Sequence, residues 1–228
     1  QIAGDADLKA GNSHVVLKGS DGARIDVSAS LQPLDLNDLN PEWTGRINGT
    51  GSLQGDRTNP DYLLKLNGSG LDVMGYRIGR FELDGNTLTV KRSRLFAEDL
   101  MISGQAIERA ELVLTGRLKD AGFQASVLSG LYALDGAGRM QWLGGKPRVD
   151  VQSLRVKGGE AGVWHLQAPM YLMLADGSYR FSPFCLGNGA HSARVCAEDT
   201  GTAIAINGAD FPLFLLEPWL NNAGKEFT

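Results

Sequence analysis

The chain has 228 residues, of which 43% are hydrophobic and 21% charged, a balance typical of a folded chain rather than a disordered one. Its formal net charge of −4 supplies no basic field for a nucleic acid, and no apolar run is long enough to span a bilayer as a helix. The 30 glycines are scattered without a three-residue period, which excludes collagen and predicts many tight turns.

The N-terminal stretch QIAGDADLK contains neither an initiator Met nor a signal peptide. We therefore expect a processed chain or an internal section of a longer protein.

Short segments of alternating polar and apolar residues recur along the chain. In the first, Ile25, Val27, Ala29 and Leu31 share one face. Such alternation over five to eight residues is the signal of a half-buried strand, and roughly fifteen segments match it. Further examples are residues 80–92, 109–118, 147–158 (with a slip near Ser153), 177–184 and 201–208. The sequence predicts an all-β chain that is overwhelmingly antiparallel.

Asn-Gly and Asp-Gly pairs occur throughout, and they suit two-residue hairpin turns because both central positions need positive φ. We expect the strand at Phe81 and Leu83 to turn at Asp84-Gly85 and to resume at Leu88. Glycines expected inside strands, namely Gly70, Gly75 and Gly79, would let a sheet bend. The pairs are Asp21-Gly22, Asn48-Gly49, Asn67-Gly68, Asp84-Gly85, Asp135-Gly136, Asp176-Gly177 and Asn207-Gly208.

Two segments depart from the strand pattern. Residues 33–43 (PLDLNDLNPEW) and 212–219 (PLFLLEPW) each start with Pro-Leu, continue with leucines at near-helical spacing, and end with Pro and Trp. Each predicts one or two helical turns. We interpret residues 1–228 as a single repeat-built section, with a boundary near 31–45 and the next unit starting near 211–220. Two unrelated surface turns are the alternative.

No catalytic or nucleotide-binding motif is complete. Pro147 follows Lys146 where a phosphate-binding loop needs Ser or Thr, and His14, His165 and His191 are far apart. The sequence has no G-x-S-x-G elbow and no H-E-x-x-H pattern, so we expect no enzymatic activity, no metal and no cofactor.

Cys185 and Cys196 are the only cysteines, and they flank a glycine-containing segment. A zinc site needs more ligands than these two, and a redox motif needs closer spacing. A hairpin would bring them within bridging distance, which predicts a structural disulfide and an oxidising compartment. Two reduced cysteines on neighbouring strands are the alternative.

The segment LDLNDLNPEWTGRINGTGSLQGDRTNPDYLLKLNGSGLDVMGYRIGRFELDG resembles the repeating segment of the TamB family, AsmA-like proteins of the Gram-negative envelope. The resemblance rests on the order of Pro41, the glycines from Gly45 to Gly55, Pro60 and YRIGRFELDG. The cysteine pair ahead of FPLFLLEPWL is also similar to this family.

The resemblance implies a long curled antiparallel sheet, an open groove or "β-taco", in the periplasm as part of an inner-membrane-anchored protein. It also implies phospholipid as cargo between the inner and outer membranes, and a TamA-like outer-membrane barrel as partner. A scaffold that assembles outer-membrane proteins by edge pairing and a lipid-free sandwich or binding module are the alternatives.

The apolar residues of the strands are the candidate lining of such a groove, although the same alternation would suit a closed sandwich core. They are Leu64, Leu66, Val73, Phe81, Leu83, Val90, Leu112, Leu114, Phe123, Val151, Val156, Trp164, Leu166, Phe181, Ile204 and Ile206.

Overall fold

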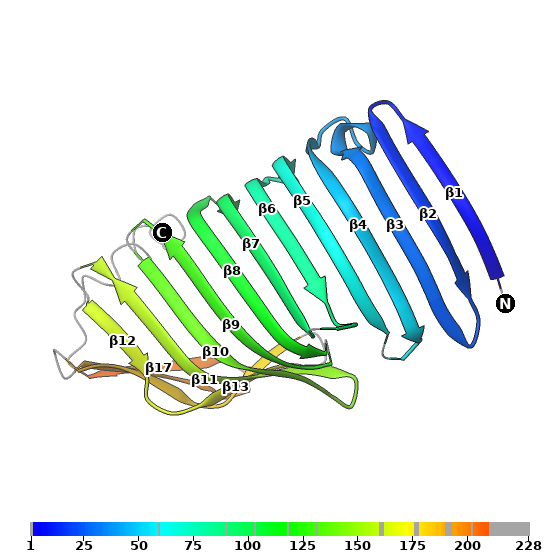
Figure 1. Ribbon diagram of the computed structural model, residues 1–228. Coiled ribbons are helices and arrows are strands. Elements are labelled where there is room, and N and C mark those ends of the chain that lie inside the picture. The colour runs from blue at the N-terminus through cyan, green and yellow to red at the C-terminus, as the bar shows by residue number, and fades with distance from the viewer. Residues whose placement is uncertain are drawn as a thin grey trace.

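The structure, a computed structural model, is one antiparallel sheet of 17 strands with a single short helix in the described part of the chain (Figure 1). It describes residues 2–58, 60–89, 91–102, 104–117, 119–130, 132–159, 162–175, 178–189, 193–201 and 203–209. The strands are β1 Ile2–Ala10, β2 Ser13–Asp21, β3 Arg24–Asp35, β4 Thr44–Asp56, β5 Asp61–Val73, β6 Tyr76–Asn86, β7 Arg92–Ile102, β8 Gln105–Arg117, β9 Asp120–Ser129, β10 Tyr132–Leu143, β11 Lys146–Gly158, β12 Gly162–Leu166, β13 Met170–Ala175, β14 Ser178–Phe181, β15 Phe184–Asn188, β16 Ala193–Asp199 and β17 Ile204–Ala209.

The strands follow one another in the sheet as they do in the sequence. From β1 to β11 each strand pairs with the next, so this part is a continuous meander of hairpins (Figure 1). Beyond it the sheet divides, because β11 pairs with β12 through residues 155–158 and with β13 through residues 148–151. The β12 branch continues to β15, β16 and β17, and the β13 branch continues to β14. Figure 1 shows these later strands turning out of the plane of β1–β11.

The expected fold class is therefore confirmed, but the expected strand length is wrong. Strands β1 to β11 have 9 to 13 residues instead of five to eight. The slip expected near Ser153 is present, because Ala137 pairs with Ser153 while Gly138 pairs with Val151. This shift keeps Val149, Val151, Leu154 and Val156 on one face.

Most of the expected hairpin turns are wrong as well. Asp21-Gly22 lies at the β2–β3 turn as predicted, but the pairs at 48–49, 67–68, 84–85, 135–136 and 207–208 lie inside strands. Asp176-Gly177 lies outside the described residues. Strand β6 continues through Asp84-Gly85 to Asn86, and the next strand starts at Arg92 rather than at Leu88. Gly75 lies in the β5–β6 turn rather than inside a strand.

Close approach of neighbouring side chains explains glycine inside these strands. A Cβ at position 68 would lie 2.2 Å from Cε1 of Phe81, the residue directly opposite on β6. A Cβ at position 85 would lie 2.8 Å from Cε2 of Tyr62. These glycines leave room for rings from the neighbouring strand, a role that glycine takes inside strands when another group must approach closely.

The expected helix at residues 33–43 is one turn of 3-10 helix, η1, Leu36–Asp38, and the second at 212–219 lies outside the described residues. Asp38 follows Leu36 in η1 and contacts the β1–β2 turn. Its Oδ2 accepts hydrogen bonds from Ser13 Oγ at 2.7 Å and from the backbone N–H of Asn12 at 2.9 Å. This contact ties η1 to the neighbouring hairpin.

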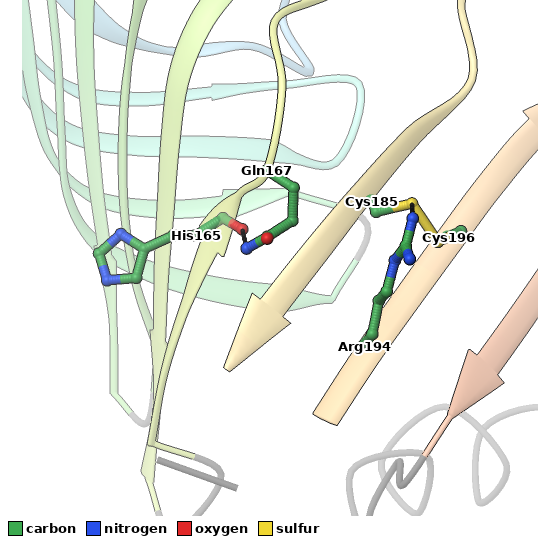
Figure 2. Close-up of a disulfide and its surroundings, with 5 residues drawn as sticks. All are labelled: His165, Gln167, Cys185, Arg194 and Cys196. Atoms are coloured by element: carbon green, nitrogen blue, oxygen red, sulfur yellow. Dashed lines mark hydrogen bonds between the residues drawn. A yellow bond between two sulfur atoms is a disulfide. The ribbon is translucent and has the colours of Figure 1, made fainter. Parts of the chain in front are cut away.

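The expected disulfide between Cys185 and Cys196 is present and joins β15 to β16, where the two residues are directly opposite (Figure 2). The Nη2 of Arg194 donates a hydrogen bond to Sγ of Cys185 at 3.0 Å. Within the described part of the chain no cysteine is free.

Candidate functional site

The register assigns almost every strand residue to one of two faces, because directly opposite residues in a sheet point to the same side. We define the apolar face as the one that carries Val27 of β3 and the residues opposite it across the sheet. Val27 pairs with Leu53, which pairs with Tyr62. Farther along, Leu83 pairs with Leu95, which pairs with Leu112. The same face continues over β9 to β17.

The polar face is covered by ion pairs between neighbouring strands. Arg94 Nε lies 2.6 Å from Glu111 Oε1, and the hydrogen bond that it donates raises the pKa of Arg94 above its ordinary value. The guanidinium carbons of Arg94 and Arg109 lie 4.9 and 5.7 Å from the ring centroid of Phe96 and shield this buried aromatic from water. Ion pairs and cation–ring contacts thus cover this part of the polar face.

The apolar face is not covered in the same way. Among the described residues only six apolar residues are buried (Leu36, Phe96, Ala97, Ala121, Trp164 and Ala193), and no large side chain is fully enclosed. On this face Leu17 is 38% exposed, Leu95 is 41% exposed and Ile206 is 70% exposed. Apolar side chains form a continuous surface here that is only half-buried by neighbours within the sheet.

A concavity of about 460 Å³ lies on the apolar face over strands β3 to β8. Its size falls within the ~300–1,000 Å³ range of small-ligand sites. Its lining includes Val27, Leu53, Leu64, Leu83 and Leu114, together with Tyr62 and Ser93.

Tyr62 spans the floor of this concavity. The Tyr62 ring passes over Gly85 on β6, and its hydroxyl lies 2.7 Å from Ser93 Oγ on β7. This hydrogen bond satisfies two polar groups on an otherwise apolar surface, as burial of such groups requires. The concavity can accept an apolar ligand without leaving these groups unpaired.

The described residues include no group of three His, Cys, Asp or Glu side chains that could hold a metal ion. No described helix has the length and hydropathy that a membrane span requires. The apolar face, with its half-exposed side chains and its concavity, is the candidate functional site.

Comparison with protein families identifies the chain. The model of the TamB N-terminal domain matches residues 3–225. The chain belongs to the TamB family. Membership of this family indicates, in general terms, a role in lipid transport or outer-membrane assembly within an envelope-spanning protein. No curated protein and no solved structure matches the chain.

The structure brings the expected TamB groove residues together on one surface. All of them lie on the apolar face except Val73, which pairs with Tyr76 beyond the interruption of the alternation at Gly70, and Val90, which lies outside the described residues. The φ of Gly70 is 62°. Residues as distant in sequence as Leu64 and Ile206 thus share one face of the sheet.

Sequence reasoning missed other members of this surface. Tyr62 alternates with Leu64 and Leu66, so its position on the face was readable from the sequence. Ser93 gave no such signal, because a serine at an apolar position interrupts the pattern. Its partner Tyr62 lies 31 residues away in the chain, a contact that only the sheet order creates.

Proposed function

We propose that this chain is one section of a periplasmic conduit for phospholipid, in which the apolar face holds acyl chains. The observation that carries this proposal is the continuity of the apolar face over all the strands, with its large side chains left half-exposed. Large contiguous apolar surfaces are rarely exposed by monomeric soluble proteins, and they typically mark a binding site. Eleven consecutive strands at ~4.8 Å spacing would carry a lipid path about 50 Å long.

Lipid carriage requires no catalytic residue on the apolar face. Acyl chains are held by burial of apolar surface, at ~25 cal/mol per Å², so the groove needs breadth rather than polar anchors. Membership of the TamB family supports lipid as the cargo. We propose carriage without catalysis, in a section of a protein anchored in the bacterial inner membrane.

Mass spectrometry tests the proposal. The chain is purified without detergent, extracted with organic solvent, and analysed for phospholipid. We expect phospholipid in near-stoichiometric amounts. A lipid-free chain that still unfolds cooperatively and takes up no lipid from vesicles would overturn the proposal.

A second role is favoured by the edge of the sheet. Strand β1 pairs with β2 along Ile2–Ala10, and its other edge has no partner among the described residues (Figure 1). An open edge can pair with another strand through backbone hydrogen bonds. We propose that outer-membrane proteins in assembly, alongside a TamA-like barrel, pair with such an edge.

The test is crosslinking from β1 to an unfolded outer-membrane protein. A photocrosslinker at Asp7, on the edge strand, should capture the client, whereas one at Asp84, inside the sheet on β6, should not. Equal capture at both positions would overturn the edge-pairing role.

A further inference from the structure

Cations gather where the strands below the concavity end. The β4–β5, β6–β7 and β8–β9 connections lie at the same end of their strands and contribute Arg57, Lys91, Arg92, Arg117 and Lys119. We name these five residues the basic rim. Lys91, Arg92, Arg117 and Lys119 are exposed, and the Arg57 side chain is 60% exposed.

The β4–β5 and β8–β9 connections contact each other, although the β6–β7 connection lies between them in the order of the sheet. Lys119 Nζ donates a hydrogen bond to the backbone carbonyl of Thr58, and Arg117 Nη2 lies 3.3 Å from Asp61 Oδ2. The N–H of Gly116 in β8 donates a hydrogen bond to the carbonyl of Lys91 at 2.7 Å. This bond attaches the β6–β7 connection to β8. The basic rim is thus one joined surface rather than three separate turns.

The positive charge of the basic rim is only partly neutralised. Arg57 is paired with Asp21, and Arg117 is paired with Asp61. Within the described part of the chain, Lys91 and Arg92 form no ion pair. Lys119 donates its hydrogen bond to an uncharged carbonyl, and its charge also interacts with the Asp56 carboxylate. Arg92 pairs with Thr115 on the polar face, so Lys91 and Lys119 are the two cations available to an anion beside the concavity.

The basic rim adjoins the concavity. Ser93, which lines the concavity, is two residues from Lys91, and Leu114 is three residues from Arg117. At a rise of ~3.3 Å per residue, the cations start about 7 to 10 Å from the apolar lining. This separation suits a molecule with an apolar tail and an anionic head joined by a short linker.

The opposite ends of the same strands carry no comparable group of unpaired cations among the described residues. Asp72, Asp99 and Glu108 lie at that end. The neighbouring cations there are already paired: Arg77 Nε lies 3.3 Å from Asp72, and Arg109 Nη2 lies 3.6 Å from Glu98. The charge asymmetry favours an anionic group at one end of the strands only.

We propose that the basic rim binds the phosphate of a phospholipid whose acyl chains occupy the concavity over β3 to β8. The inference rests on the proposed function and deepens it, because it specifies a phosphate-bearing lipid and one orientation of that lipid. Lysine and arginine bind phosphate oxygens through charge-assisted hydrogen bonds, which are stronger than neutral ones. Lys91 and Lys119 supply these donors.

A lipid-binding assay on the detergent-free chain tests the proposal. The probes are fluorescent phosphatidylglycerol, fluorescent diacylglycerol with the same acyl chains, and inorganic phosphate as competitor. The variant is Lys91→Glu with Lys119→Glu, and Lys91→Gln with Lys119→Gln serves if charge reversal prevents folding. The matched control is Lys9→Glu with Lys157→Glu, which makes the same charge change at exposed lysines near the opposite end of the strands.

We expect the rim variant to bind phosphatidylglycerol about tenfold or more weakly, since each of the two lysines near an anionic lipid surface contributes about fivefold in affinity. Its affinity for diacylglycerol should equal that of the unmodified chain, and the control should match the unmodified chain for both lipids. Inorganic phosphate should not displace the lipid at millimolar concentration.

Three results would overturn the proposal. Unchanged phosphatidylglycerol binding in the rim variant removes the rim from recognition while leaving the proposed function intact. Displacement by inorganic phosphate identifies a site for the free ion rather than for a lipid. Absence of binding to either lipid overturns the proposed function itself.

Discussion

Gly68 on β5 lies directly opposite Phe81 on β6, and a Cβ on Gly68 would lie 2.2 Å from Cε1 of that ring. The ring lies across the glycine on the apolar face. Substitution with even the smallest side chain must therefore displace it.

Gly68→Ala should destabilise the chain by about 1–3 kcal/mol, the range for overpacking a well-packed site. Chemical denaturation with urea measures the loss. Gly4→Ala is the matched control, because nothing lies within 4 Å of a Cβ at that strand position, and it should change stability little. Combining Gly68→Ala with Phe81→Ala should cost less than the sum of the two single variants, and strict additivity would contradict the contact.

Leu114→Arg should remove most of the bound lipid while the chain still folds. Leu114 is half-buried on the apolar face and lines the concavity, so a guanidinium there can reach solvent but blocks acyl chains. Thr115→Arg, on the polar face of the same strand, should leave lipid binding unchanged. Lipid extraction followed by mass spectrometry compares the two, and unfolding of the Leu114→Arg variant would indicate a closed core instead.

Asp38→Ala should destabilise the N-terminal hairpin by about 1–2 kcal/mol, because Ser13 Oγ and the Asn12 N–H both lose their acceptor. Amide hydrogen exchange should show faster exchange at Asn12. Asp38→Asn keeps one acceptor oxygen and should retain part of the protection. Unchanged exchange in Asp38→Ala would show that the contact does not hold the hairpin.

Replacement of Cys185 and Cys196 by serine should lower the free energy of unfolding by about 3 kcal/mol, since the bond closes a loop over a sequence separation of 11 residues. The loss should appear in urea denaturation under oxidising conditions. A reductant should lower the stability of the unmodified chain and leave the serine variant unaffected. If both respond equally to reductant, the disulfide is not the source of the stability.

Asp120 gives the chain a dependence of stability on pH. Hydrogen bonds from Arg139, at 2.6 Å to each carboxylate oxygen, hold the pKa of Asp120 below its usual value. Because the pKa of Asp120 is lower in the folded chain, the Asp120–Arg139 pair adds to the free energy of unfolding when the pH is above the unfolded-state pKa. This stabilisation is lost as the pH falls through the folded-state pKa. The effect should be small, because both side chains are exposed.

Urea denaturation of Asp120→Asn at about pH 7 and about pH 3 measures this difference. The variant should be less stable than the unmodified chain at the higher pH, and the gap should narrow at the lower pH. Asp26→Asn, at an exposed carboxylate with no ion pair in the described structure, is the matched control for the loss of one negative charge. A constant gap at both pH values would contradict the role of the ion pair.

The sequence by itself determined the all-β class, the disulfide and most of the apolar face. Alternation depends only on the geometry of a strand, in which successive side chains point to opposite faces, so Leu112 and Leu114 were assigned to one face without knowledge of their neighbours. The bulge near Ser153 was also readable, because the alternation shifts there.

Turns and strand lengths were decided by tertiary structure. Asn67-Gly68 and Asp84-Gly85 have the local chemistry of hairpin turns, yet both lie inside strands because their glycines accommodate Phe81 and Tyr62 from neighbouring strands. A contact between strands overrides a local turn preference, and no local pattern records which ring will lie over which glycine.

Only the tertiary structure decided whether the apolar face is exposed and where charge gathers. An alternating strand has the same pattern beside a dry core and beside an open groove, and the half-exposure of Leu17 and Leu95 distinguishes the two. The basic rim depends on the meeting of Thr58 and Lys119, which lie 61 residues apart. The order and curvature of the strands create that meeting, and these are properties of the whole sheet rather than of any segment.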